Sequence, residues 1–184
     1  MISEAVTLEP VESAPQRNAA RELIGEYLRW VGEIARSQYG LSFDLDAMVD
    51  SDIGDRSKFY PPSGRFYLVM SEGAYVGVGC LKRLARGVGE IQRMYVQPHV
   101  RGKGAGRLLV ERLLADALEL GYTRVRLESL KALTAAHTLY HSVGFVDIPP
   151  YDDDSMKDYQ DPSTRARYLD SALFMQYTFP DAGV

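Results

Sequence analysis

The chain has 184 residues, of which 46% are hydrophobic and 25% are charged, and its net charge at neutral pH is −4. This length suits one domain with a substantial core, and the composition is typical of a soluble globular protein. The negative charge argues against a general nucleic-acid binder and against a membrane-surface binder. The single cysteine, Cys80, excludes an internal disulfide and a multi-cysteine zinc site.

The N-terminal part predicts a strand followed by a long helix. Residues 5–10 form a short β pattern that ends at Pro10. Ser13 is a suitable N-cap, and apolar residues recur at i+3 and i+4 spacing across residues 14–37. Since neither a signal peptide nor a membrane-spanning run is visible, we expect a cytoplasmic protein without a membrane partner.

The next stretch, residues 38–64, is rich in loops and in aspartate, and one short helix is expected around residues 45–49. The aspartates at its centre are Asp44, Asp46, Asp50, Asp52 and Asp55. Their spacing lacks the glutamate that completes a calcium-binding loop, so the pattern favours a solvated acidic surface. The alternative is a surface that attracts a cationic acceptor.

The middle of the chain predicts most of a β-sheet. Residues 65–70 and 75–81 alternate as two antiparallel strands joined by a hairpin. A central strand follows from Glu90 to Val96, and a helix over residues 104–120 comes after it. The helix acts as a crossover connection, so the next strand should lie parallel to the central one.

That next strand covers residues 123–128, and a helix over residues 133–142 leads to another strand. Residues 151–170 are polar without clear periodicity, and residues 171–179 predict a closing strand. This order predicts an α/β domain with one mixed, mostly antiparallel sheet of about seven strands and helices on both faces.

We expect a single domain over residues 1–184 with three parts. Residues 1–64 would supply the first strand and the helices that follow it. Residues 65–147 would form the core, and residues 148–184 the C-terminal loop and closing strand.

A glycine-rich loop separates the central strand from the following helix. From Arg101 to Arg107 it reads Arg-Gly-Lys-Gly-Ala-Gly-Arg. Glycines let the backbone approach a ligand, and the free N–H groups at a helix start bind phosphate. The loop lacks the Lys-Ser/Thr ending of a P-loop, and Arg107 stands where a dinucleotide fingerprint needs its third glycine. It is therefore predicted to bind a pyrophosphate of another kind.

The spacing Arg101-x-x-Gly104-x-Gly106 after a strand resembles the pyrophosphate loop of the GNAT superfamily of acyl-CoA-dependent N-acyltransferases. A second stretch, Leu139-Tyr140-x-x-x-Gly144-Phe145, resembles another signature of that superfamily. The resemblance covers roughly residues 65–179. It implies a GNAT-like fold, which agrees with the order of the predicted elements. It also implies an acyl-CoA site within residues 65–147 and acceptor-site helices within residues 1–64.

The resemblance also implies acetyl-CoA as co-substrate, with main-chain groups of a splayed central strand pairing with the pantetheine arm. The implied cofactor-binding residues are Met94, Tyr95, Val96, Arg101, Gly102, Lys103, Gly104, Ala105, Gly106 and Arg107. An N–H group near Tyr95 would polarise the thioester carbonyl.

Acyl transfer to an amine needs a base, a donor to the oxyanion and a group that assists the leaving sulfur. By resemblance, Glu90 is the candidate base and Tyr140 the candidate acid, and Glu128 is a second candidate base. The alternatives are an exposed carboxylate at a strand start for Glu90 and core packing for Tyr140. His137 and His141 lie one helical turn apart but lack a third ligand, so we predict a solvated flank and no metal site.

The sequence thus predicts an N-acetyltransferase that moves an acetyl group from acetyl-CoA to a primary amine of a small molecule or peptide, by direct attack on the thioester. Alternatives are a non-catalytic acyl-CoA-binding or sensing module, and an acyltransferase for another acyl-CoA. The run Asp152–Asp154 either clamps a cationic acceptor or is solvated. A homodimer through the sheet edge or the late strands stays open.

Overall fold

The computed structural model describes residues 6–152, 156 and 159–180. Its elements in chain order are β1 (Thr7–Pro10), α1 (Ala14–Tyr39), α2 (Leu45–Gly54), α3 (Arg56–Phe59), β2 (Arg65–Ser71), β3 (Ala74–Ala85), β4 (Val88–Val96), the 3₁₀ turn η1 (Pro98–Val100), α4 (Ala105–Glu119), β5 (Arg124–Leu130), α5 (Thr134–Ser142), β6 (Val146–Ile148), α6 (Pro162–Ser171) and β7 (Ala172–Thr178). None of the helices in the described ranges combines the length and the apolar character that a bilayer span needs.

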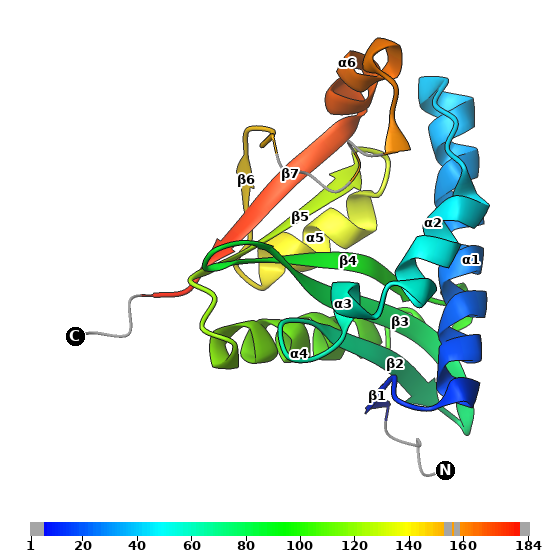
Figure 1. The fold of residues 1–184 in the computed structure, drawn as a ribbon, viewed down its shortest axis with the longest axis vertical. Coiled ribbons are helices and arrows are strands. Elements are labelled where there is room, and N and C mark those ends of the chain that lie inside the picture. The colour runs from blue at the N-terminus through cyan, green and yellow to red at the C-terminus, as the bar shows by residue number, and fades with distance from the viewer. Residues whose placement is uncertain (1–5, 153–155, 157–158, 181–184) are drawn as a thin grey trace.

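Seven strands form one sheet in the order β1-β2-β3-β4-β5-β7-β6, shown in Figure 1. The pairs β1–β2, β2–β3, β3–β4, β5–β7 and β6–β7 are antiparallel. β4 and β5 are parallel, because α4 carries the chain back to the same end of the sheet. The predicted mixed, mostly antiparallel sheet is confirmed.

Helices cover both faces of this sheet (Figure 1). On one face, α4 packs through Leu109 and Leu113, which are fully buried with side chains of β2 to β5. On the other face, α1 packs through Ile24 and Leu28 against β2, β3 and β4. The apolar stripes of these two helices therefore hold the central strands between them, as their periodicity predicts.

The ends of α1 follow the signals in its sequence. Ser13 accepts a hydrogen bond from the N–H of Gln16 at 3.3 Å, and the Gln16 side chain accepts one from the N–H of Ser13 at 2.9 Å. Gly40 ends the helix with a φ of 64°, the left-handed conformation that glycine adopts without strain. The predicted helix is confirmed and extends two residues further, to Tyr39.

The polar stretch before the last strand contains a helix that the periodicity did not indicate. α6 buries only Tyr168 and Ser171, so its sequence lacks a broad apolar stripe. Its start is marked locally, because the Asp161 side chain accepts from two backbone N–H groups and Pro162 takes the first helical position. Asp152 is exposed, and the other two aspartates of its run lie outside the described residues.

Candidate active site

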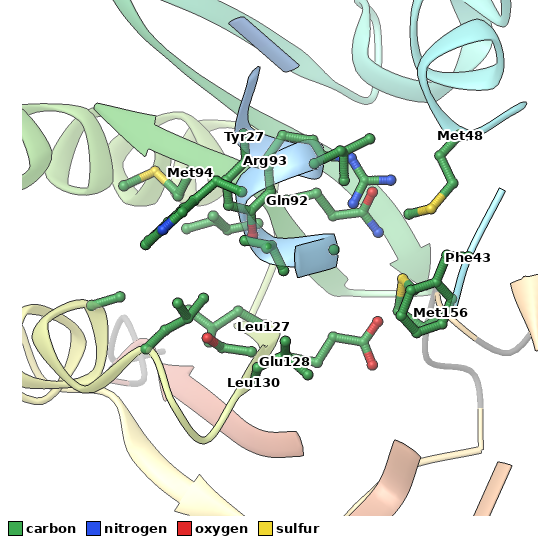
Figure 2. A pocket seen from close by; sticks show the side chains of 18 of the residues that line it. Tyr27, Phe43, Met48, Gln92, Arg93, Met94, Leu127, Glu128, Leu130 and Met156 are labelled. Atoms are coloured by element: carbon green, nitrogen blue, oxygen red, sulfur yellow. The ribbon is translucent and has the colours of Figure 1, made fainter. Parts of the chain in front are cut away.

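A β-bulge in β4 shapes the middle of the sheet. The register of β3 against β4 shifts between Val78 and Cys80, where one residue of β3 faces two of β4, Arg93 and Met94. Arg93 has a φ of 55°, a left-handed conformation that costs a residue with a side chain roughly 1–3 kcal/mol. The extra residue resets the alternation, so Gln92 and Arg93 extend side by side (Figure 2), while Met94 packs with the α4 core.

β4 and β5 separate just beyond Glu90. Their parallel pairing covers three residue pairs, from Val88–Arg124 to Glu90–Arg126. Beyond these pairs, residues 91–94 of β4 and residues 127–130 of β5 line a cleft of about 960 Å³, counting space open to solvent. The predicted splay of the central strand from its parallel neighbour is confirmed.

Both helix layers contribute walls to this cleft. Ala136 and Tyr140 line it from α5, while Tyr27 and Met48 line it from α1 and α2. The cleft therefore connects the α4/α5 layer with the α1/α2 layer through the gap in the sheet. A ligand on one side can meet a ligand on the other inside this gap.

Charged and apolar side chains meet at one end of the cleft, shown in Figure 2. Arg93 reaches into the cleft from β4 and Glu128 from β5, so the two side chains come from opposite walls. Both point toward a rim of apolar side chains formed by Phe43, Met48 and Met156. This end of the cleft thus combines one cation, one carboxylate and an apolar rim.

The two candidate bases lie in different surroundings. Glu90 is fully buried, and its Oε1 accepts a hydrogen bond from Nε2 of Gln92 at 2.5 Å. Gln92 lines the cleft and Glu90 is not among its lining residues, so Gln92 separates Glu90 from the cleft. The alternative of an exposed carboxylate for Glu90 is wrong, because β4 is a central strand covered by helices on both faces. Glu128 lines the cleft directly.

Tyr140 is buried in the wall formed by α5. Its side chain is 6% exposed, and its ring centroid lies 5.7 Å from that of Phe145. Burial, with a smaller contribution from the nearby Tyr27, raises the pKa of Tyr140 well above its usual value. Tyr140 therefore packs in the core and also presents a neutral phenol to the cleft.

α4 begins at the glycine loop that the sequence singled out. Gly102 and Gly104 have φ values of 78° and 86°, and Gly104 is the N-cap. The first backbone bond of the helix runs from the N–H of Leu108 to the carbonyl of Gly104 at 3.0 Å. The N–H groups of residues 105–107 consequently lack partners within the helix, which favours an anion with several acceptor oxygens.

Of the three basic side chains of this loop, two contact neighbouring elements and one is exposed to solvent. Arg101 donates to a carbonyl at the end of β4 at 2.8 Å and lies over the ring of Trp30, 4.9 Å from its centroid. Arg107 donates to Oγ of Ser142 at 2.7 Å. Lys103 is exposed. Arg101 and Arg107 therefore tie the loop to α1 and α5, contacts that the sequence alone did not predict.

A buried ion cluster joins α2 to the bulge. Asp52 is fully buried, and its carboxylate lies 2.5 Å from Nε of Arg93 and also accepts a hydrogen bond from Nζ of Lys58. Burial disfavours the positive charge of Arg93, but the attraction of Asp52 outweighs burial and leaves the pKa of Arg93 above its usual value. The prediction of a solvated surface is wrong for Asp52, because α2 turns it inward while Asp50 pairs with Arg21 at the surface.

The two histidines of α5 make polar contacts within the fold. His137 is 7% exposed, so the predicted solvated flank is wrong for this residue. Its Nε2 lies 3.1 Å from Oγ of Ser129, and burial lowers its pKa. His141 lies 2.7 Å from a carboxylate oxygen of Asp147. Across the ranges that the structure describes, no three histidine, cysteine or acidic side chains gather where they could hold a metal.

Comparison with known proteins identifies the family. Residues 19–145 match the family model described as the acetyltransferase (GNAT) family. The chain belongs to the GNAT family. An IAA acetyltransferase from Azospirillum brasilense is 30% identical over 139 residues, which cover 75% of this chain and 84% of that protein. An uncharacterized N-acetyltransferase from Escherichia coli is 32% identical over 143 residues, which cover 73% of this chain and 86% of that protein. The GNAT protein described here is an acetyltransferase enzyme.

Solved GNAT structures share the fold. The PaiA N-acetyltransferase from Thermoplasma acidophilum, determined in complex with coenzyme A, aligns with a TM-score of 0.66 and 14% identity over 95% of this chain and 99% of that chain. A putative streptothricin acetyltransferase from Bacillus anthracis, determined in complex with acetyl coenzyme A, aligns with a TM-score of 0.54 and 21% identity over 66% of each chain. The glycine loop with its free N–H groups and the splayed β4 fit such a ligand, and the predicted GNAT fold is confirmed.

Of the residues predicted for the site of this GNAT protein, Met94, Glu128 and Tyr140 line the cleft. Glu90, Tyr95, Val96 and the loop residues 101–107 are not among its lining residues. Gln92, Arg93 and Tyr27 line it as well, and sequence reasoning assigned them no role. Their side chains reach the cleft because of the bulge in β4 and the packing of α1. The bulge has no local sequence signal strong enough to find it, and the apolar repeat of α1 indicates a buried face but not that Tyr27 lines a cleft.

Proposed function

We propose that this enzyme transfers the acetyl group of acetyl-CoA to a primary amine of a small molecule or peptide. The observation that carries the proposal is the parting of β4 and β5 beside the glycine loop, with Tyr140 on one side of the gap and Glu128 on the other. This arrangement would hold the thioester and the amine next to each other, which is the main requirement of direct transfer.

The donor would be held mainly by main-chain groups. The free N–H groups of residues 105–107 would bind the pyrophosphate, supported by the positive charge of Lys103 and by the helix dipole of α4. Beyond the last β5 pair, the main-chain groups of Met94 and Val96 would pair with the pantetheine amides. An N–H near Tyr95 would then stabilise the negative charge that develops on the thioester oxygen.

The acceptor amine must lose a proton before it attacks, because an alkylamine is mostly protonated at neutral pH. Glu128 and Glu90 are the two candidate bases, and the geometry favours Glu128 because it lines the cleft. Glu90 would need a water to reach past Gln92. In either case the carboxylate takes one proton from the ammonium, directly or through that water, and the neutral nitrogen forms its bond to the carbonyl carbon. The nitrogen gives its second proton to water when the tetrahedral intermediate collapses to the amide.

Tyr140 would assist the departing sulfur. As the bond between the carbonyl carbon and sulfur breaks, the sulfur receives the electron pair and needs a hydrogen-bond donor. A tyrosine phenol is protonated at neutral pH, and the raised pKa of Tyr140 favours this form further, so it can donate that bond. We propose donation of a hydrogen bond as the chief role of Tyr140, with the thiolate finally protonated from water.

Isothermal titration with acetyl-CoA tests the donor site. We expect micromolar binding to the intact protein and loss of binding in Gly104→Glu, because the new carboxylate would repel the pyrophosphate and strain a position with a φ of 86°. Gly54→Glu is the matched control, since Gly54 is exposed and no atom lies within 4 Å of the added Cβ. Absence of binding to the folded intact protein would refute the proposal, as would equal binding by both variants.

Steady-state kinetics separate the two candidate bases. In an assay of thiol release with an active amine, the base is the residue whose Glu→Gln substitution lowers kcat by about 10²–10⁴ at pH 7. We expect this loss for Glu128→Gln and a smaller one for Glu90→Gln. Glu111→Gln, on the exposed face of α4, serves as the control.

A further inference from the structure

Arg93 holds a positive charge that acetyl transfer itself does not require. Its Nε lies 2.5 Å from Oδ2 of Asp52, and its Nη2 lies 3.5 Å from Oδ1 of the same carboxylate. In the described part of the chain, Nη1 of Arg93 has no hydrogen-bond acceptor. The side chain is only 9% exposed and lines the cleft. A buried guanidinium edge thus remains available to a ligand.

The charges around Arg93 do not cancel. Asp52 contributes one negative charge, and it is shared by Arg93 and by Lys58, whose side chain is 12% exposed. One carboxylate between two cations leaves one positive charge at the wall of the cleft. A charge in such a poorly solvated place attracts an anion strongly, because water cannot compensate it.

The backbone at Arg93 is strained in a way that a glycine would relieve. A φ of 55° is unfavourable for arginine and costs glycine nothing. Residues in such conformations persist where their surroundings hold them, often beside ligands. At this bulge, arginine occupies a position whose backbone conformation favours glycine. Its side chain brings a positive charge to the cleft, which glycine could not supply.

The opposite wall supplies the complementary group. Glu128 faces Arg93 across the cleft (Figure 2), and Tyr27 lies close to both side chains. Burial chiefly raises the pKa of Tyr27, Arg93 lowers it, and Glu128 with Asp52 raises it again. The charges of Arg93 and Glu128, on opposite walls of the cleft, therefore both act on Tyr27.

We propose that the acceptor is an amino carboxylate, such as an α-amino acid with an apolar side chain. Its carboxylate binds Nη1 of Arg93, its amine faces Glu128, and its apolar substituent lies against Phe43, Met48 and Met156. The proposal rests on the proposed acetyl transfer and specifies the substrate class for that site.

Matched acceptors test the carboxylate directly. Thiol release from acetyl-CoA is measured with the twenty standard amino acids, their amides and the corresponding decarboxylated amines. For at least one apolar amino acid, we expect kcat/KM to exceed that of its amide by roughly 10- to 100-fold, the effect of one charge-assisted hydrogen bond. Turnover of the amides or amines at equal or higher kcat/KM overturns the proposal, and so does a lack of turnover of every amino acid.

The variant Arg93→Met assigns the effect to this residue. It leaves Asp52 paired with Lys58, so the cluster becomes neutral and the fold is retained in circular dichroism. We expect it to abolish the preference for carboxylate over amide while turnover of the amide and titrated affinity for acetyl-CoA stay within about threefold. Equal losses for the carboxylate and the amide would mean that Arg93 only supports the fold, which overturns the proposal.

Two further variants test whether the preference for carboxylate depends on Arg93, and the titration with acetyl-CoA separates a missing acceptor preference from a failed donor site. Arg21→Met, which removes an exposed arginine paired with Asp50, should keep the preference for carboxylate. Arg93→Lys keeps a charge but loses the fork of N–H groups, and should retain only part of the preference. If acetyl-CoA binds and amides react without preference, the acetyl transfer stands and the amino carboxylate does not. If acetyl-CoA fails to bind, both are refuted.

Discussion

Removing the charge of Asp52 should destabilise the protein strongly. The carboxylate is fully buried and is shared by Arg93 and Lys58, whose side chains are 9% and 12% exposed. In Asp52→Asn, two cations lose their partner in a place that water barely reaches. Breaking a buried ion pair by removing one member costs about 3–5 kcal/mol. We expect the free energy of unfolding to fall by this amount.

Urea denaturation followed by circular dichroism measures the loss. In thermal unfolding, a loss of 1 kcal/mol lowers Tm by about 2–4 °C for a domain of this size, so the Tm of Asp52→Asn should fall by about 6–20 °C. Asp50→Asn is the matched control on the same helix, because Asp50 is 70% exposed and its pair with Arg21 should be worth less than about 1 kcal/mol. The slope of the unfolding free energy against urea should be unchanged in both variants.

A double variant sharpens the test. Asp52→Asn combined with Arg93→Met removes one of the two stranded cations and leaves Lys58 near the surface. We therefore expect it to recover part of the stability that Asp52→Asn loses. If Asp52→Asn were no more damaging than Asp50→Asn, the buried cluster would not exist in solution, and the reasoning about its charge would be refuted.

Other predictions follow from single contacts. Tyr140→Phe should lower kcat by about 10²-fold and leave the titrated affinity for acetyl-CoA within about twofold; unchanged kcat would remove Tyr140 from the chemistry. Gly77→Ala places a Cβ 2.7 Å from the carbonyl oxygen of Tyr95. It should cost about 1–3 kcal/mol in urea denaturation, and a neutral effect would contradict the packing beside the bulge. Burial lowers the pKa of His137 below 6.5, so its contribution to stability should be present above pH 6.5 and lost as the pH falls through the folded-state pKa. In His137→Gln, the free energy of unfolding measured by urea denaturation should vary less between pH 5 and pH 7. An unchanged variation with pH would contradict this role of His137.

Local signals made much of the fold predictable. Ser13, Gly40 and the apolar repeat between them mark the limits and the buried face of α1 within the sequence itself. The glycine loop before α4 is equally local, since the positive φ at Gly102 and Gly104 demands glycine. The crossover helix then determines the parallel pair of β4 and β5.

The acceptor side could not be predicted in the same way. The bulge at Arg93 depends on the register of β4 against β3, and nothing in the adjacent residues indicates it. Asp52 looks like its exposed neighbours until α2 is docked, and Glu90 looks exposed until β4 is placed at the centre of the sheet. Side chains whose environment is set by tertiary packing carry no local periodic signal. The cytoplasmic location and the homodimer stay predictions.

The gap in the sheet divides the enzyme into two parts that can change independently. The residues proposed to hold the donor lie between Met94 and Arg107, next to the α4/α5 layer. Those proposed to choose the acceptor are Arg93 in the bulge, Glu128 on β5, Met48 on α2, and Phe43 and Met156 outside the helices and strands. A protein engineer could therefore vary Phe43, Met48 or Met156 to accept new amines while leaving the acetyl-CoA loop intact. In the same way, the acceptor specificity of related enzymes could change during evolution while the residues that bind the donor stay the same.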